Sequence, residues 1–197
     1  MSQSPSPLDA SRLVIHKSDS LRQCPPVKDI VFGRTFTDHM LKIPWTAARG
    51  WGEPSIEPYG PLSLEPSSVV LHYAVTLFEG MKAYRDDHGK VRLFRPEKNM
   101  ERMNRSASRI CLPNFDETEL LKLIKKLVQL DQHWVPSEPG YSMYIRPTLI
   151  GTEPSVSVTQ TSEALLFVIL SPVGPYYSSG VKPVCLLYTS PSPRDQR

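Results

Sequence analysis

The pattern of hydrophobic and polar positions in the second half of the chain predicts two strong strands. Residues 141–150 read YSMYIRPTLI, which mixes aromatic and aliphatic side chains over strand length. Residues 164–170 read ALLFVIL, an unbroken apolar run that is typical of a strand buried on both faces. Pro172 and Gly174 follow this run and are expected to end it.

The first half of the chain predicts shorter elements. Residues 36–43 (FTDHMLKI) indicate a strand that Pro44 closes. Residues 55–66 contain three prolines and favour short edge strands and turns. Residues 67–78 predict a short helix that ends before Gly80.

A hairpin and two helices are predicted between these two halves. Residues 82–85 and 90–95 flank the loop DDHG, which suits a four-residue hairpin connection. Pro96 stands at a favoured first helical position, and an apolar face follows at helical spacing, formed by Met100, Met103, Ala107 and Ile110.

Pro113 is expected to stop that helix, and the next begins at Asp116, with Glu119 three residues later as in a capping box. Its inner face is expected to contain Leu120, Ile124, Leu127 and Trp134. Its outer face is expected to contain Lys122, Lys125 and Lys126, more in keeping with a solvated surface than with a nucleic-acid patch.

The order of strands, two helices and strands, without βαβ alternation, predicts an α+β sheet domain. We expect a disordered arm at 1–28, which is rich in serine and proline, and the sheet domain at 29–174. The high proline content, 20 of 197 residues, also argues against a helical bundle.

Charge and cysteine content exclude several function classes. The formal net charge of +3 is too small to indicate nucleic acid by itself, and no apolar run approaches the roughly 18 residues of a membrane span. The cysteines are three and widely spaced, which excludes a disulfide scaffold and indicates a reducing compartment. The five histidines are scattered, so we expect no metal site.

The strand at 141–150 carries the first candidate for chemistry. Tyr144 and Arg146 are two residues apart, so they point to the same face of the sheet. The planar fork of an arginine fits a carboxylate, which makes Arg146 a candidate for anion binding. A surface salt bridge on an edge strand explains the same pattern, and the spacing alone favours that explanation.

Two weaker candidates accompany it. Arg102, Arg105 and Arg109 fall on one face of a helix and could hold a phosphate, although a solvated polar face is the default explanation. The segments LHY (71–73) and FEG (78–80) place aromatic residues around a turn, for which core packing is the default explanation.

Taken together, these segments resemble a known family. VFGRTFTDHML, LHYAVTLFEGMKAYR, RLFRPEKNMERMNRSA, YIRPTLIGTEP and LLFVILSPVGPYY are similar to branched-chain amino acid aminotransferases of the eukaryotic type. The resemblance runs from about residue 30 to residue 177. It implies a pyridoxal 5′-phosphate enzyme of fold type IV that has a small N-terminal α+β domain, a larger second domain and a homodimeric assembly. The implied reaction is transamination of leucine, isoleucine and valine with 2-oxoglutarate.

The resemblance also assigns site residues. Arg102, in NMERM, matches the arginine that holds the cofactor phosphate, while Arg105 and Arg109 remain structural. Pocket residues on the substrate side are implied at Phe32, Tyr73, Tyr144, Arg146 and Tyr176. Val158 lies in a loop that, in the family, reaches toward the site of the partner subunit.

The resemblance fades after about residue 180. Residues 175–184 are expected to begin an interdomain linker, and residues 185–197 look foreign to the family. No lysine here matches the family's Schiff-base lysine, so no catalytic residue is assigned and the chain alone is expected to be inactive.

Two alternatives to the branched-chain enzyme remain. One is a sister fold-type IV enzyme, such as a D-amino acid aminotransferase or aminodeoxychorismate lyase. The other is a non-catalytic fragment that dimerises with, or poisons, a complete subunit. Arg12, Lys17 and Arg22 faintly suggest a mitochondrial transit peptide, but Asp9 and Asp19 favour a cytoplasmic location.

Overall fold

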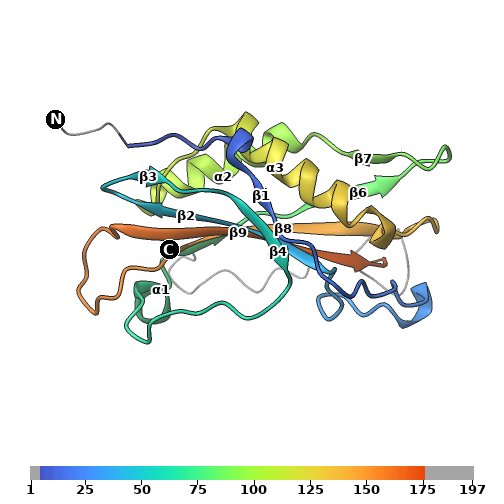
Figure 1. The fold of residues 1–197 in the computed structure, drawn as a ribbon, viewed down its shortest axis with the longest axis horizontal. Helices are drawn as coiled ribbons and strands as arrows, with labels where there is room; N and C mark the ends of the chain where they lie inside the picture. Colours follow the sequence, from blue (N-terminus) through green and yellow to red (C-terminus); the bar gives the residue numbers. More distant parts are fainter. Residues whose placement is uncertain (1–4, 176–197) are drawn as a thin grey trace, which may run out of the picture.

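The computed structural model describes residues 5–175 as one mixed sheet covered by two helices on one face (Figure 1). The main path through the sheet runs β1-β4-β2-β9-β8-β6-β7, with β3 paired to β2 and β5 paired to β8. The strands are β1 (Val14–Ile15), β2 (His39–Thr46), β3 (Gly50–Trp51), β4 (Ser55–Pro58), β5 (Thr76–Phe78), β6 (Met81–Arg85), β7 (Val91–Leu93), β8 (Ser142–Gly151) and β9 (Glu163–Val173). The predicted α+β class is confirmed.

Helices α2 (Pro96–Arg109) and α3 (Glu117–Leu130) form the covering layer, and the short α1 (Val69–Tyr73) lies on the other side of the sheet in Figure 1. Pro96 opens α2, and the Asp116 carboxylate caps α3 by accepting from the backbone N–H groups of Thr118 and Glu119. Both predicted starts are confirmed. The core between helices and sheet includes the fully buried Met100, Met103, Leu120, Ile124, Met143, Ile145, Leu166 and Val168.

Three of the predicted element boundaries that differ from the structure bear on how the sheet and helices pack. Strand β2 continues through Pro44, because β4 pairs with residues 39–42 and β3 with residues 45–46, so the missing N–H of Pro44 falls between the two partners. The helix predicted over 67–78 ends at Tyr73, since Ala74 takes a left-handed conformation with φ 52° and Thr76–Phe78 pairs with β8. Ile110 lies beyond the last turn of α2 and is 37% exposed.

The segment expected to be a disordered arm packs along the sheet over the part that the structure describes. Leu8 is buried, and β1 pairs in parallel with β4. The Arg22 side chain donates to the Asp38 carboxylate, and the backbone N–H of Ser18 donates to His39 Nε2 over 2.9 Å. These partners lie 16 or more residues away, so the local serine- and proline-rich composition does not reveal them.

Within residues 5–175, the apolar run 164–170 of strand β9 is buried on one face only, contrary to the expectation from its sequence. Its even-numbered residues from Ala164 to Leu170 face α2 and α3 and are buried, whereas Leu165, Phe167 and Ile169 are half-buried on the opposite face. Tyr144, Arg146 and Thr148 of β8 are half-buried in the same alternation. We call this second side of the sheet the open face.

The two faces of β9 differ in what they contribute to stability, and two neighbouring leucines test this. Leu166→Ala leaves a cavity in the covered core and is expected to lower the free energy of unfolding by about 2–5 kcal/mol. Leu165→Ala on the open face is the matched control, with an expected loss of roughly 1 kcal/mol. Urea unfolding of the two variants measures the difference, and equal losses would contradict the one-sided burial.

Candidate functional site

A backbone corner between β5 and β6 organises the candidate site. Both strands pair with β8, β5 with residues 148–150 and β6 with residues 143–145. Phe78, Glu79 and Gly80 span the gap, and the Glu79 N–H donates to the Pro147 carbonyl over 2.9 Å. We call these three residues the FEG corner.

The carboxylate of Glu79 lies inside this corner and holds Arg102. Glu79 is only 4% exposed. Arg102 donates to it through Nε and through Nη2, the latter over 2.6 Å, and Asn99 Nδ2 donates over 3.0 Å. Asn99 and Arg102 are three residues apart on α2, so one face of the helix supplies both donors.

These contacts keep Glu79 ionised. Burial alone would raise the pKa of this carboxyl, but hydrogen bonds from Arg102 and Asn99, together with the charge of Arg102, outweigh burial and hold the pKa below its usual value. The pair therefore brings a fixed positive group to the surface of α2, where the Arg102 side chain is 57% exposed.

A second arginine is fixed on the open face beside the same corner. Arg146 donates from Nε and Nη2 to the Tyr144 hydroxyl, over 3.1 and 2.9 Å. Its guanidinium group lies 4.1 Å from the centre of the Phe78 ring, which adds a cation–π contact. A Cβ atom at Gly80 would collide with the end of the Tyr144 side chain, so a larger residue here would displace the tyrosine that holds Arg146.

A cavity of about 190 Å³ adjoins this pair, lined by Phe32, Gly33, Phe36, Tyr144, Arg146, Ile169 and Ser171. The ring centres of Phe32 and Tyr144 are 5.9 Å apart. The lining is mostly aromatic and aliphatic, with one cation at its edge. This volume is below the roughly 300–1,000 Å³ of a complete ligand pocket, so these residues form one part of a site.

The exposed side of Arg102 borders a hollow of about 400 Å³ with a different character, lined by Phe94, Arg95, Lys98, Asn99, Glu101, Arg102 and Arg105. Four cationic side chains face a single carboxylate there, and Lys98 pairs with that carboxylate over 2.8 Å. Because Arg102 uses only two of its five N–H groups on Glu79, the donor set fits a phosphate group.

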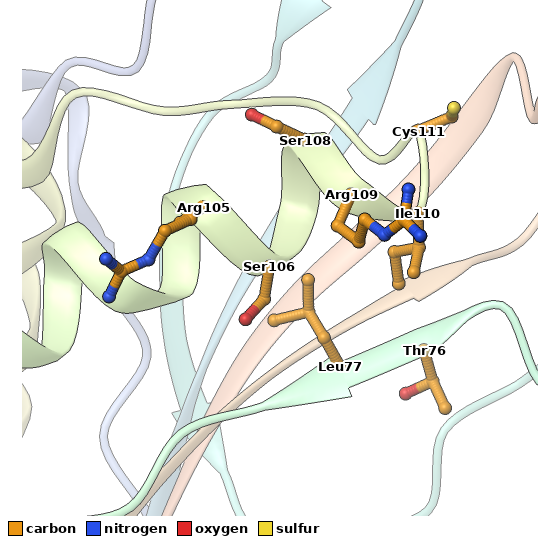
Figure 2. A pocket seen from close by; sticks show the side chains of 8 residues that line it. All are labelled: Thr76, Leu77, Arg105, Ser106, Ser108, Arg109, Ile110 and Cys111. Carbon is orange, nitrogen blue, oxygen red and sulfur yellow. The ribbon is translucent and has the colours of Figure 1, made fainter.

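A larger hollow of about 840 Å³ lies between the end of α2 and β5 (Figure 2). In this view Leu77 reaches from β5 toward α2, while Arg105 and Arg109 point away from each other. These two arginines therefore do not converge on one anion in this larger hollow.

The residues implied by the resemblance are thus only partly brought together. Phe32, Tyr144 and Arg146 share the cavity, and Arg102 meets them through the FEG corner. The Tyr73 hydroxyl donates instead to the carbonyl of Val156, and Val158 is 85% exposed on the same loop. Tyr176 lies outside the described residues.

Sequence reasoning missed Glu79 and Phe78, although both stand in the FEG segment that it singled out. The feature that could have drawn attention to Glu79 is an acidic residue between two largely apolar strands. Its partners Asn99 and Arg102 follow 20 and 23 residues later in the chain. No local period links these positions, because a hairpin and the first turn of a helix separate them.

The pairing of Glu79 predicts a specific loss of stability at low pH. Its folded pKa lies below the ordinary 4.5, so the ionised pair contributes stability above that value and loses it as the pH falls through the folded pKa. Glu79→Gln is expected to lower the free energy of unfolding at pH 7 by about 1–3 kcal/mol.

The difference from the unchanged chain should shrink as unfolding is measured at successively lower pH. Glu101→Gln is the matched control, because Glu101 forms an exposed ion pair with Lys98 on the same helix and should change stability little. A Glu79→Gln effect that persists undiminished below about pH 3 would contradict the pairing.

Comparison with known proteins identifies the family. A model described as amino-transferase class IV matches residues 76–197, a span that includes the residues expected to be foreign, so that boundary stays a prediction. The chain is 58% identical over 180 residues to the mitochondrial branched-chain-amino-acid aminotransferase of Saccharomyces cerevisiae, covering 91% of this chain and 46% of that protein. It is 56% identical to the cytosolic enzyme of the same yeast, over 91% of this chain and 48% of that protein. The chain thus spans about half the length of the curated relatives it matches.

Solved structures of aminotransferases share the fold of this chain over part of their length. The branched-chain aminotransferase of the archaeon Thermoproteus uzoniensis with norvaline matches at a TM-score of 0.54 and 25% identity, over 69% of this chain and 42% of that chain. The branched-chain amino acid aminotransferase of Escherichia coli matches at a TM-score of 0.52 and 20% identity, over 68% of this chain and 40% of that chain. The resemblance found in the sequence is confirmed, and the chain belongs to the class IV aminotransferase family.

Proposed function

We propose that this chain supplies part of the cofactor and substrate site of a branched-chain-amino-acid aminotransferase. The reaction would exchange the amino group of leucine, isoleucine or valine with 2-oxoglutarate, using pyridoxal 5′-phosphate. The observation that carries the proposal is the fixed Tyr144–Arg146 pair beside an apolar cavity of about 190 Å³. Identity of 58% to the yeast mitochondrial enzyme supports it.

The substrate side combines a cation with an apolar wall. Arg146 donates its Nε proton and one Nη2 proton to the Tyr144 hydroxyl. The outer edge of the guanidinium group remains for a substrate carboxylate. Phe32, Phe36 and Ile169 line the cavity and suit a branched aliphatic side chain. Such a wall also excludes water, which strengthens the contact between arginine and carboxylate.

The cofactor side rests on Arg102. Its outer N–H groups would hold the phosphate group in the basic hollow beside α2. When bound, pyridoxal phosphate supplies the electron sink that transamination needs. The resemblance assigns the proton transfer to a lysine of the family's second domain, and a hybrid with a relative's second domain supplies that lysine.

We also propose that the protein works as a homodimer. The loop at residues 152–162 supports this, since Val158 is 85% exposed and the Tyr73 hydroxyl ties α1 to Val156. An exposed valine at the tip of a braced loop suits a contact with the site of a partner subunit. Sedimentation of the hybrid described below would measure the assembly.

For location we propose the cytoplasm, because Asp9 and Asp19 interrupt the basic residues of the N-terminal segment and transit peptides are poor in acids. Fractionation of cells that express the tagged chain would test this, and mitochondrial recovery would overturn it.

Transamination can be tested in a hybrid protein that joins this chain, after its aligned segment, to the C-terminal part of the yeast mitochondrial relative. The hybrid is expected to convert leucine and 2-oxoglutarate. Arg146→Ala should lower kcat/KM for 2-oxoglutarate by about 10- to 100-fold, because a carboxylate then lacks its cation.

Arg92→Ala is the matched control. Arg92 is an exposed arginine in the hairpin, where it pairs with Asp86. It should leave kcat/KM unchanged. If the hybrid folds and converts D-alanine or aminodeoxychorismate instead of leucine, one of the sister enzymes is the better assignment. If Arg146→Ala leaves the rate unchanged in a folded hybrid, the substrate role of Arg146 is wrong.

A further inference from the structure

Glu79 is a buried charge whose contacts do more than fill the core. A buried ion pair contributes little net stability over a well-packed apolar residue, because desolvation offsets the attraction between the charges. Glu79 nevertheless has four hydrogen-bond contacts to its carboxylate, from Arg102 twice, from Asn99 and from the N–H of Gly80. The donors belong to the candidate site or its border, so these contacts indicate that Glu79 sets the positions of site residues.

We propose that Glu79 is a positioning residue that sets the guanidinium group of Arg102 for the phosphate of the cofactor. This inference rests on the proposed function, since it takes Arg102 as a phosphate ligand. Glu79 itself faces the inner edge of the guanidinium group and does not touch the phosphate.

The geometry of the pair supports this role. Glu79 takes up Nε and Nη2 of Arg102, which are the two donors on one edge of the planar fork. One Nη1 proton and the second Nη2 proton remain on the outer edge, where two parallel hydrogen bonds to a phosphate can form. The bond to the carboxylate therefore orients the free edge without using it.

Holding the Arg102 side chain in one conformation before binding should raise the affinity for a phosphate. Arg102 is 57% exposed, and an exposed arginine otherwise samples many rotamers. Immobilising a flexible side chain on binding lowers affinity, so a pre-set Arg102 avoids a corresponding loss.

The same corner positions the substrate-side arginine. Phe78 packs against the Arg146 guanidinium at 4.1 Å, and Gly80 leaves room for the Tyr144 hydroxyl that holds Arg146. Glu79 stands between these two residues, and its N–H is fixed to Pro147 of β8. One short segment thus sets the distance between the phosphate-binding and the carboxylate-binding arginine.

Removing the Glu79 carboxylate would change the affinity for a phosphate in two opposing ways. Loss of a negative charge near the phosphate would tighten binding by simple Coulomb attraction. Loss of the positioning contact would weaken binding. A positioning role requires the second effect to exceed the first.

The experiment compares two ligands that differ only in the phosphate, pyridoxine 5′-phosphate and pyridoxine. Neither carries an aldehyde, so neither reacts with lysines. Their dissociation constants are measured by calorimetry in the hybrid protein, for the unchanged residue, Glu79→Gln and Glu79→Asp. Glu79→Gln should weaken the phosphorylated ligand by about three- to tenfold and leave pyridoxine unchanged. Glu79→Asp, which keeps the charge, should recover part of the loss.

Glu101→Gln serves as the charge control, because it removes a carboxylate from the same hollow without contacting Arg102. It should bind the phosphorylated ligand slightly more tightly, since it removes a negative charge near the phosphate without removing a contact to Arg102. In an Arg102→Ala background, Glu79→Gln should have no further effect on the preference for phosphate.

A second readout uses the 197-residue chain alone. The Arg102 Nε–H signal in an arginine-selective NMR spectrum should be protected from exchange and should lose that protection in Glu79→Gln. Loss of protection together with weaker phosphate binding supports the proposal.

The failures are distinguishable. If the unchanged hybrid shows no preference for the phosphorylated ligand, the cofactor role of Arg102 is wrong and this inference falls with it. If it prefers that ligand and Glu79→Gln binds it equally or more tightly, the proposed function stands and the positioning role of Glu79 is overturned. Equal weakening of both ligands would show a structural role and would also overturn it.

Discussion

A buried carboxylate at the junction of two strands and a helix constrains the rest of this structure. Glu79 is almost without solvent contact, so its charge must be met by donors inside the protein. Those donors come from α2, at Asn99 and Arg102, and they draw the helix against the turn between β5 and β6. The lowered pKa of Glu79 is the electrostatic consequence of that arrangement.

Two arginines, one on either side of this junction, are held in place by internal hydrogen bonds of the same kind. Arg102 and Arg146 each use Nε and Nη2 on an internal acceptor, a carboxylate in one case and the Tyr144 hydroxyl in the other. Each keeps the outer edge of its fork for an anion. The FEG corner contacts both arginines, through the Glu79 carboxylate and the Phe78 ring, so one short backbone segment relates their positions.

Periodic segments were predictable from sequence because their burial is local. Strands β8 and β9, the hairpin and the starts of α2 and α3 follow from alternation, from the DDHG loop, from Pro96 and from Asp116. Strand β5 was missed because the choice between helix and strand at residues 75–78 is made by pairing with β8, far away in sequence. The packing of Leu8 and Arg22 was missed for the same reason, since their partners are distant.

The contacts of the candidate site also differ in whether local sequence predicts them. Tyr144 and Arg146 share a face through strand alternation, which the sequence states directly. The connection of Arg102 to Glu79 depends on how α2 packs against β5, and no local pattern encodes that contact. Resemblance supplied the residues of the site, whereas the structure supplied the corner that relates them.

A crystal structure of the hybrid protein with pyridoxal 5′-phosphate bound would show how Arg102 meets the phosphate. We expect the phosphate to contact the outer edge of Arg102 while Nε and Nη2 remain on the Glu79 carboxylate, with Phe78 still packed on Arg146. A phosphate bound after Arg102 has rotated away from Glu79, or bound without Arg102, would contradict this expectation.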